Sequence, residues 1–185
     1  MDLFDAKSAA LITQLQRQQV AYLLVGGYAV NIHGYSRGTG DLDIWIRPTA
    51  DNVLRLVAAF VACDYDVTGL AEYAPQVPTQ GLSLRVIDEP FILDVMTHIN
   101  GITFDAAYAH HKTYDFDGLE IHLIHRNDLV LNKLSSGREK DLADVRSLQF
   151  IEAYWNGQKL EVYEKPSPQS SLPSDTKESG DTASA

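Results

Sequence analysis

Apolar and polar positions along the first third of the chain predict three helices and two strands. Residues 4–18 place apolar side chains at helical spacing with Gln and Arg between them, which predicts an amphipathic helix. The apolar run at 21–25 predicts a buried strand that a pair of glycines ends, and a short helix is expected over 26–34. The run DLDIWI at 41–46 predicts a second strand, followed by a helix over 49–63.

The rest of the chain predicts two hairpins and three helices. Residues 64–80 are polar and contain prolines, so we expect a loop with no more than one helical turn there. Alternating segments that flank Glu89-Pro90 and Asp117-Gly118 are typical of β-hairpins. The expected elements are strands 82–88 and 91–96, a helix at 103–111, a hairpin over 112–124, and helices at 127–134 and 138–155.

Length and composition favour one compact domain. The chain has 185 residues, of which 45% are hydrophobic, enough for one substantial core and a small helical appendage. Its single cysteine excludes an intramolecular disulfide, and no apolar run approaches the roughly 18 residues that cross a bilayer. The N-terminal sequence has no basic segment followed by an apolar one, so we expect a cytoplasmic protein.

The charge of the chain bears on its partners. The formal net charge is −10 and the pI is near 4.9. A broad electrostatic attraction to nucleic acid normally needs a basic face, so the overall charge argues against it. A local basic pocket stays compatible with this charge.

Two aspartates interrupt the apolar strand at 41–46. Because side chains alternate along a strand, Asp41 and Asp43 project from one face, whereas Leu42 and Ile44 project into a core on the other. Two carboxylates so close repel each other, and the pKa of one would rise unless a cation lay between them. Mg²⁺ prefers hard oxygen ligands and is the cation that this pair predicts. The alternative is a strand end whose acids face solvent.

A third aspartate lies in a similar apolar context. Asp94 is part of FILDVM, between Leu93 and Val95, with no basic residue next to it. If strands 41–46 and 91–96 are neighbours, the three acids converge. Two would hold metal, and the third would ligate a second metal or take the proton of an attacking hydroxyl, as in two-metal phosphoryl transfer. Three acids in two apolar strands favour this interpretation over solvent-facing strand ends.

The glycine pair would supply the other half of such a site. Without Cβ atoms, Gly26 and Gly27 let the backbone approach phosphate oxygens, and amides at the start of the following helix offer free N–H donors. A double glycine between a strand and a helix is equally typical of a packing turn. The phosphate interpretation therefore depends on the acids that follow.

Together these residues resemble the signature of the nucleotidyltransferase superfamily typified by DNA polymerase β. That signature is an apolar residue with a glycine pair, a spacer, and two acids separated by one apolar residue. Val25-Gly26-Gly27, a spacer of thirteen residues, and Asp41-Leu42-Asp43-Ile44 match it at each position. The spacer YAVNIHGYSRGTG and the run NDLVLNKLSSGREKDLADVRSL are also similar to the AbiEii toxin-like nucleotidyltransferases. The resemblance covers about residues 20–150.

The resemblance implies roles for individual residues. It implies that three carboxylates are catalytic and bind Mg²⁺, with Mn²⁺ as an alternative: Asp41, Asp43 and Asp94. It implies that the phosphates of an NTP contact two glycines and two cations: Gly26, Gly27, Arg37 and Lys133. The positive charge of Lys133 would neutralise the triphosphate or the leaving pyrophosphate. The alternative for Lys133 is an ordinary solvated lysine.

The activity that the resemblance implies is transfer of a nucleoside monophosphate from an NTP to an acceptor, with release of pyrophosphate. RNA, a protein or a small molecule such as an antibiotic all stay open as acceptors. The AbiEii-like residues imply the toxin of a toxin–antitoxin system, with an antitoxin protein as partner. The second hypothesis is a nucleotide-binding or antitoxin-type module without turnover. The acids argue against it, because an inactive chain has no physical reason to keep mutually repelling carboxylates in buried strands.

Other polar residues receive structural interpretations. His33 is interpreted as a helix-end or packing residue, and the remaining histidines lack a zinc-binding spacing, so we predict no zinc. Asp144 and Lys140 can pair across one turn of a solvated helix, an effect worth only a few tenths of a kcal/mol. The roles of Asp141 and Lys140 in the site stay open.

The expected fold is α+β, a mixed α/β domain with a small, mostly antiparallel sheet that carries the acids on one face. Helices flank this sheet, and a short C-terminal helical unit faces the cleft. We expect a nucleotidyltransferase core over 1–125 and a helical unit over 126–160 that packs on it. The last 20 residues contain no aromatic residue and one large aliphatic residue, Leu172, so we expect a disordered tail, which we assign to 161–185.

Overall fold

The computed structural model describes residues 4–116 and 118–156, which form fifteen helices and strands. The expected tail at 161–185 and the end of the expected helical unit lie outside the described residues. The elements are, in chain order, α1 (Ala6–Arg17), β1 (Tyr22–Leu24), α2 (Gly26–Ile32), β2 (Asp41–Ile46), α3 (Ala50–Val61), α4 (Leu70–Tyr73), the 3₁₀ helix η1 (Ala74–Gln76), α5 (Val77–Gln80), β3 (Ser83–Asp88), β4 (Phe91–Met96), α6 (Phe104–Tyr108), β5 (Lys112–Phe116), β6 (Leu119–Leu123), α7 (Arg126–Ser136) and α8 (Glu139–Trp155).

One six-stranded sheet in the order β3-β4-β2-β1-β6-β5 organises the molecule. The pairs β3–β4, β2–β1 and β6–β5 are antiparallel, whereas β4–β2 and β1–β6 are parallel. The two hairpins follow the alternation in the sequence and form the outer pairs of the sheet. A mixed, mostly antiparallel sheet with flanking helices is thus confirmed.

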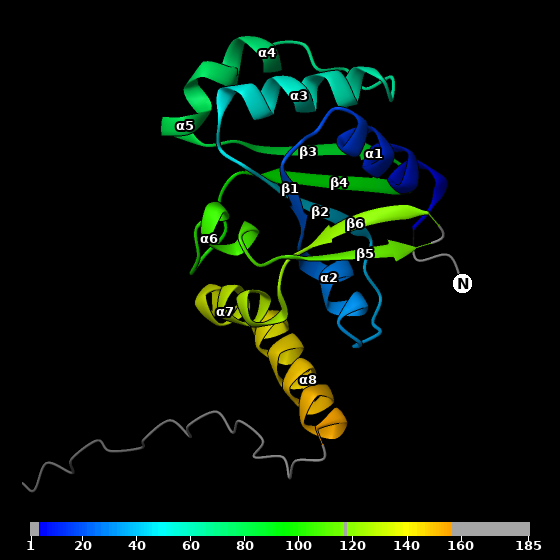
Figure 1. Ribbon diagram of the computed structural model, residues 1–185, viewed down its shortest axis with the longest axis vertical. Coiled ribbons are helices and arrows are strands. Elements are labelled where there is room, and N and C mark those ends of the chain that lie inside the picture. The colour runs from blue at the N-terminus through cyan, green and yellow to red at the C-terminus, as the bar shows by residue number, and fades with distance from the viewer. Residues whose placement is uncertain (1–3, 117, 157–185) are drawn as a thin grey trace, which may run out of the picture.

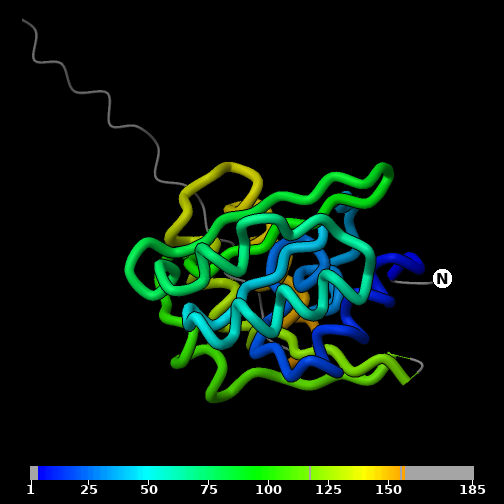
Figure 2. Tube along the Cα trace, turned by 90° about the horizontal axis from the view of Figure 1, so that it is seen from above, coloured from blue at the N-terminus to red at the C-terminus, as the bar shows by residue number. Residues whose placement is uncertain are grey.

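Helices cover the sheet from opposite ends of the molecule. Figure 1 shows α3, α4 and α5 beyond one end of the sheet and α7 and α8 at the other. In the view from above, α3 and the segment from α4 to α5 lie over the strands (Figure 2). Side chains from α1, α3 and the strands share one buried hydrophobic cluster. Among the described residues, no helix has the length and apolar character needed to cross a membrane.

The segment 64–80 is more helical than its sequence pattern predicts. It contains α4, η1 and α5 in succession, where we expected a loop. Leu70, Ala74 and Val77 are buried and follow each other at helical spacing. The prediction was wrong because Pro75 and Pro78 seemed to break the pattern, yet each lies in the first turn of its own short helix, where the missing N–H costs nothing.

Asn52 fastens α3 to the sheet. Its side chain is buried, with 4% of the residue exposed. The amide oxygen accepts from the backbone N–H of Ala21 at 2.7 Å, and the amide nitrogen donates to the carbonyls of Ala21 and Arg47 at 3.0 and 3.2 Å. These carbonyls and this N–H lie at the ends of β1 and β2. One side chain therefore satisfies three backbone groups where the two central strands meet the helix.

We expect Asn52→Ala to lower the free energy of unfolding by about 2–3 kcal/mol, because it leaves buried backbone groups without partners. Urea denaturation monitored by circular dichroism measures the change. Asn132→Ala is the matched control, since the Asn132 side chain donates one exposed hydrogen bond to the carbonyl of Asn100. An Asn52→Ala variant as stable as the control would contradict the fastening role.

Candidate active site

The pairing of β2 with β4 brings the three aspartates together on one face of the sheet. Asp43 lies directly opposite Asp94 in the parallel register, and Asp41 precedes Asp43 by two positions on the same face. Leu42 and Leu93, on the opposite face, are buried in the core with 1% and 0% exposed. Because β2 and β4 are neighbours, the three acids lie close together, as the sequence predicted.

The glycine pair lies against these acids because no side chain fits there. Gly26 has φ +61°, and a Cβ on it would lie 1.9 Å from Oδ2 of Asp43. A Cβ on Gly27 would lie 2.2 Å from Oγ1 of Thr39. The N–H of Gly27 donates to Oδ2 of Asp43 over 3.4 Å. Close approach of α2 to the Asp43 carboxylate therefore requires glycine at position 26, and close approach to Thr39 requires glycine at position 27.

Asp43 is the one of the three aspartates whose negative charge has no ion-pair partner among the described residues. Burial raises its pKa, the N–H of Gly27 counteracts this, and the charges of Asp94 and Asp41 raise the pKa further. Among the described residues, no Lys, Arg or His forms an ion pair with Asp43. The charged form of this buried carboxylate consequently favours a cation beside it.

Asp94 has a basic partner that inspection of its sequence neighbours missed. Arg85 on β3 lies directly across the hairpin from Asp94 and donates to both carboxylate oxygens, over 2.7 and 2.6 Å. The same guanidinium lies 3.7 Å from Oδ2 of Asp41. In the described part of the chain, no three His, Cys, Asp or Glu side chains are grouped so that they could hold a metal ion. Arg85 occupies the space beside Asp94 that a cation would need.

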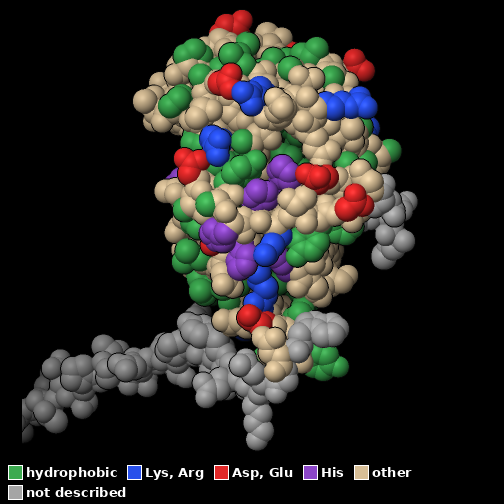
Figure 3. Space-filling model, in the orientation of Figure 1, with side chains coloured by type: hydrophobic (Ala, Val, Ile, Leu, Met, Phe, Trp, Pro, Cys, Tyr) green, Lys and Arg blue, Asp and Glu red, His purple; other side chains and the backbone are tan. Residues whose placement is uncertain are grey.

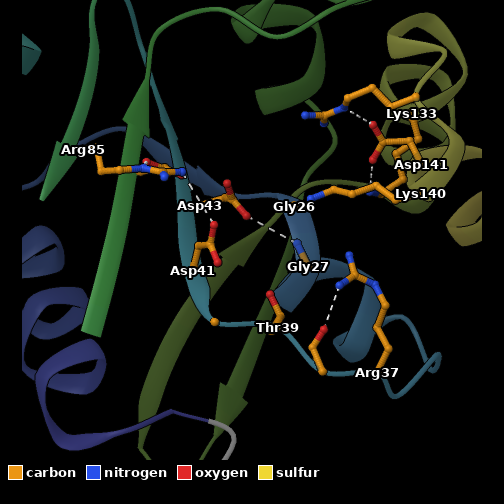
Figure 4. A pocket seen from close by; sticks show the side chains of 14 residues that line it. Gly26, Gly27, Arg37, Thr39, Asp41, Asp43, Arg85, Lys133, Lys140 and Asp141 are labelled. Atoms are coloured by element: carbon orange, nitrogen blue, oxygen red, sulfur yellow. Dashed lines mark hydrogen bonds and ion pairs between the residues drawn. The ribbon is translucent and has the colours of Figure 1, made fainter. Parts of the chain in front are cut away.

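A cavity of about 300 Å³ separates the acids from the C-terminal helices. This volume is at the lower end of the range for small-molecule sites. In Figure 4, Asp41, Asp43 and Arg85 lie on the strand side, the glycines lie in the middle, and Lys133, Lys140 and Asp141 lie on the helix side. The residues that line it are Gly26, Gly27, Arg37, Gly38, Thr39, Gly40, Asp41, Asp43, Arg85, Asp94, Lys133, Arg138, Lys140 and Asp141.

The two cations expected to contact phosphates both line this cavity but bind Asp144. Arg37 donates to both carboxylate oxygens of Asp144 over 2.7 and 3.0 Å, and Nζ of Lys133 donates to Oδ2 over 2.7 Å. Lys133 is buried, with 4% exposed, so the solvated alternative for it is wrong. Asp144 is also buried, which corrects its interpretation as a solvated partner of Lys140.

Asp141 extends this ion cluster along α8. It accepts from Nζ of Lys133 at 2.9 Å, from Nε of Arg138 at 2.6 Å and from the hydroxyl of Ser136 at 2.5 Å. Burial alone would raise the pKa of Asp141, but these three donors outweigh it and hold the pKa at about 2. The cluster joins the spacer after α2 to α7 and α8.

Lys140 lines the cavity without an ion-pair partner among the described residues. It lines the cavity from the first turn of α8, and within residues 4–116 and 118–156 no carboxylate pairs with it. The sequence left the role of Lys140 open, because charged residues of both signs surround it on the same helix. The packing of α8 directs Asp141 and Asp144 into ion pairs with Lys133 and leaves Lys140 able to bind an anion.

The histidines lie outside this cavity. His33 ends α2, and its Nε2 lies 2.9 Å from the carbonyl oxygen of Ile124, so the helix-end interpretation is confirmed. Burial lowers the pKa of His33. Several histidine side chains gather on the face drawn in Figure 3. The ring centroids of His110 and His125 lie 5.4 Å apart, and those of His111 and His122 lie 5.0 Å apart.

The sheet, the paired acids and the glycine turn define a domain of the nucleotidyltransferase type. Residues 2–156 match the family described as "Nucleotidyltransferase of unknown function (DUF6036)", and the chain belongs to this family. Membership of the nucleotidyltransferase superfamily is thereby confirmed, whereas a particular closeness to the AbiEii toxin-like group stays a prediction. No curated protein matches the chain.

Removal of the Asp144 charge should destabilise the fold. We expect Asp144→Asn to lower the free energy of unfolding by about 3 kcal/mol, because it deprives a buried lysine and a half-buried arginine of their shared carboxylate. Urea denaturation at pH 7 measures this. Asp105→Asn is the control, since the Asp105 side chain is 79% exposed and its ion pair with Arg47 should contribute less than about 1 kcal/mol. Equal effects of the two substitutions would contradict the structural role of Asp144.

Asp141 should make the free energy of unfolding fall at low pH. Its folded pKa of about 2 lies below the unfolded value of about 4, so its contribution is fully present above pH 4 and is lost as the pH falls toward 2. The shift corresponds to about 2 kcal/mol. Urea titrations between pH 5 and 2 should show a steeper loss for the wild type than for Asp141→Asn. An exposed control, Asp51→Asn, should keep the wild-type slope.

Proposed function

We propose that the protein is a divalent-metal-dependent nucleotidyltransferase that moves a nucleoside monophosphate from an NTP to an acceptor hydroxyl and releases pyrophosphate. One observation carries this proposal. Asp41, Asp43 and Asp94 share one face of β2 and β4, the glycine turn lies against Asp43, and the acids and the turn line a cavity whose far wall carries lysine and arginine side chains. The family supports the reaction class, since its description is that of a nucleotidyltransferase.

The side chains present fit Mg²⁺, or Mn²⁺ as an alternative. The candidate ligands are hard carboxylate oxygens, and the raised pKa of Asp43 shows a buried acid without a paired cation. Asp41 and Asp43 would hold the ion, and Asp94 would join them after Arg85 has moved away. When bound, the ion would neutralise phosphate charge and make the attacking oxygen a better nucleophile.

The opposite wall of the cavity fits the phosphates. Lys140 is positioned to bind phosphate oxygens, and the backbone of Gly26 and Gly27 lines the same cavity. Arg37 and Lys133 contribute positive potential from their ion pairs with Asp144 and hold the wall in place. Their roles are therefore primarily positioning, although both line the cavity.

The reaction then proceeds by in-line displacement at the α-phosphorus. The acceptor oxygen forms a bond to the α-phosphorus while the bond from that phosphorus to the bridging oxygen breaks. Pyrophosphate leaves with the electron pair of the broken bond. The hydroxyl proton passes to a carboxylate of the acid group.

The cellular role is part of the proposal and comes from the sequence resemblance. We propose a cytoplasmic enzyme, and the AbiEii-like residues make a toxin restrained by an antitoxin protein the first role to test. Co-expression with the product of a neighbouring gene, scored by growth, addresses that role directly. RNA, protein and small molecules are the acceptor classes to compare.

Asp41→Asn should reduce turnover by about a hundredfold or more, because it removes a metal ligand from the site where charge develops. The assay follows release of pyrophosphate and transfer of label from each α-labelled NTP in Mg²⁺, and Asp51→Asn serves as the exposed control. Lys140→Ala should raise KM for the NTP about tenfold. Full activity of Asp41→Asn would refute the site. Tight NTP binding by the wild type without turnover on any acceptor would instead identify a nucleotide-binding module.

A further inference from the structure

A second cavity adjoins the first across the carboxylates. Its volume is about 670 Å³, and it shares Asp43, Asp94, Arg85 and Arg138 with the nucleotide cavity. The two cavities therefore meet at the acids, where the α-phosphorus would lie under the proposed function. A ligand in the second cavity can therefore reach the same carboxylates as a ligand in the first.

The wall of the second cavity is part polar and part apolar, and it lacks further acids. Besides the shared residues it contains the polar side chains of Tyr73, Gln80, Ser83, Thr97 and His98 and the apolar side chains of Leu82 and Met96. The hydroxyl of Tyr73 donates to the carbonyl of Gly81 over 3.1 Å, which fixes that wall. Its only carboxylates among the described residues are the two shared aspartates. The polar side chains of this wall can form hydrogen bonds with the hydroxyl groups of a ligand.

The charge of this cavity depends on the partner of Arg85. The guanidinium is satisfied by Asp94 alone, apart from the more distant Asp41, and its side chain is 55% exposed. Arg85 also lies on β3, an outermost strand of the sheet. It can leave Asp94 without opening the core. A divalent cation held by Asp94 would take the counter-charge from Arg85 and would repel the guanidinium.

We propose that the second cavity binds the acceptor, and that Arg85, released from Asp94, binds a phosphate group carried by that acceptor. This inference rests on the proposed function. Arg138 supports it from the other side, since its side chain is 68% exposed and only Nε is used by Asp141. Two guanidinium groups with free N–H donors form a site for a doubly charged anion.

The acceptor class is consequently a hydroxyl compound with a phosphate near its reactive hydroxyl. Polycationic aminoglycosides are excluded, because Arg85 and Arg138 would repel their ammonium groups and the cavity offers no further carboxylate to bind them. The net charge of −10 adds repulsion toward long polyanions, so a small phosphorylated acceptor fits better than an extended nucleic acid.

Calorimetry with ribose 5-phosphate and ribose tests the inference on the full chain. The protein is first saturated with Mg²⁺ and α,β-methylene-ATP, so that the nucleotide cavity is filled. We expect ribose 5-phosphate to bind at least tenfold more tightly than ribose, and Arg85→Gln to remove that preference. Arg85→Lys should restore part of it, because it keeps the charge but not the fork of donors. Arg55→Gln, an exposed arginine paired with Asp51, is the matched control.

Mn²⁺ binding supplies an independent readout. Arg85→Gln should bind Mn²⁺ several-fold more tightly than the wild type in electron paramagnetic resonance titrations, because no guanidinium competes for Asp94. The same titration without nucleotide also verifies that the variant is folded and retains its site.

Three outcomes would overturn the acceptor inference. They are equal binding of ribose and ribose 5-phosphate, unchanged affinities in Arg85→Gln, and tighter binding of kanamycin than of ribose 5-phosphate. If a short single-stranded RNA competes with ribose 5-phosphate in the wild type but not in Arg85→Gln, the phosphate belongs to an RNA end and the inference stands. Failure of the wild type to bind Mg²⁺ and α,β-methylene-ATP would refute the proposed function itself.

Discussion

The buried carboxylate of Asp144 is the interaction on which the geometry of the site depends. A charge in the protein interior is tolerated only with well-placed counter-charges, and Asp144 receives one from the spacer after α2 and one from α7. Such a cluster contributes little net stability compared with an apolar core, but it accepts only one relative position of its members. It thereby fixes the glycine turn and the spacer against the helices that form the opposite wall.

The sheet register controls the other wall. Because β2 and β4 are parallel neighbours, Asp43 and Asp94 face each other, and antiparallel pairing of β3 places Arg85 beside them. A shift by one residue in either strand would turn its aspartates into the core. The buried leucines on the reverse face oppose such a shift. The register that packs these leucines into the core is therefore the same register that places the aspartates in the site.

Much of this arrangement was predictable from local patterns. Alternation around Glu89-Pro90 and Asp117-Gly118 predicted both hairpins, and the apolar strands predicted the shared face of the acids. The hairpin centred on Glu89-Pro90 also pairs residue 85 with residue 94, so the partner of Asp94 could have been found by counting outward from the turn. The Asp144 cluster could not, because Arg37 lies 107 residues before Asp144 in the sequence and no spacing rule relates the two.

The difference between the two walls explains how an acidic site can fold before its ligands arrive. On the helix wall the ion pairs are buried, so they persist and serve as scaffold. On the strand wall the compensating cation is a half-exposed arginine on an edge strand, which can leave Asp94 without disturbing the core. Asp43, which has no such partner, keeps its raised pKa and its preference for a cation. The Arg85–Asp94 pair, which can open, thus lies beside the cavities that ligands would enter. The buried Lys133–Asp144 pair lies where it holds the helices in position.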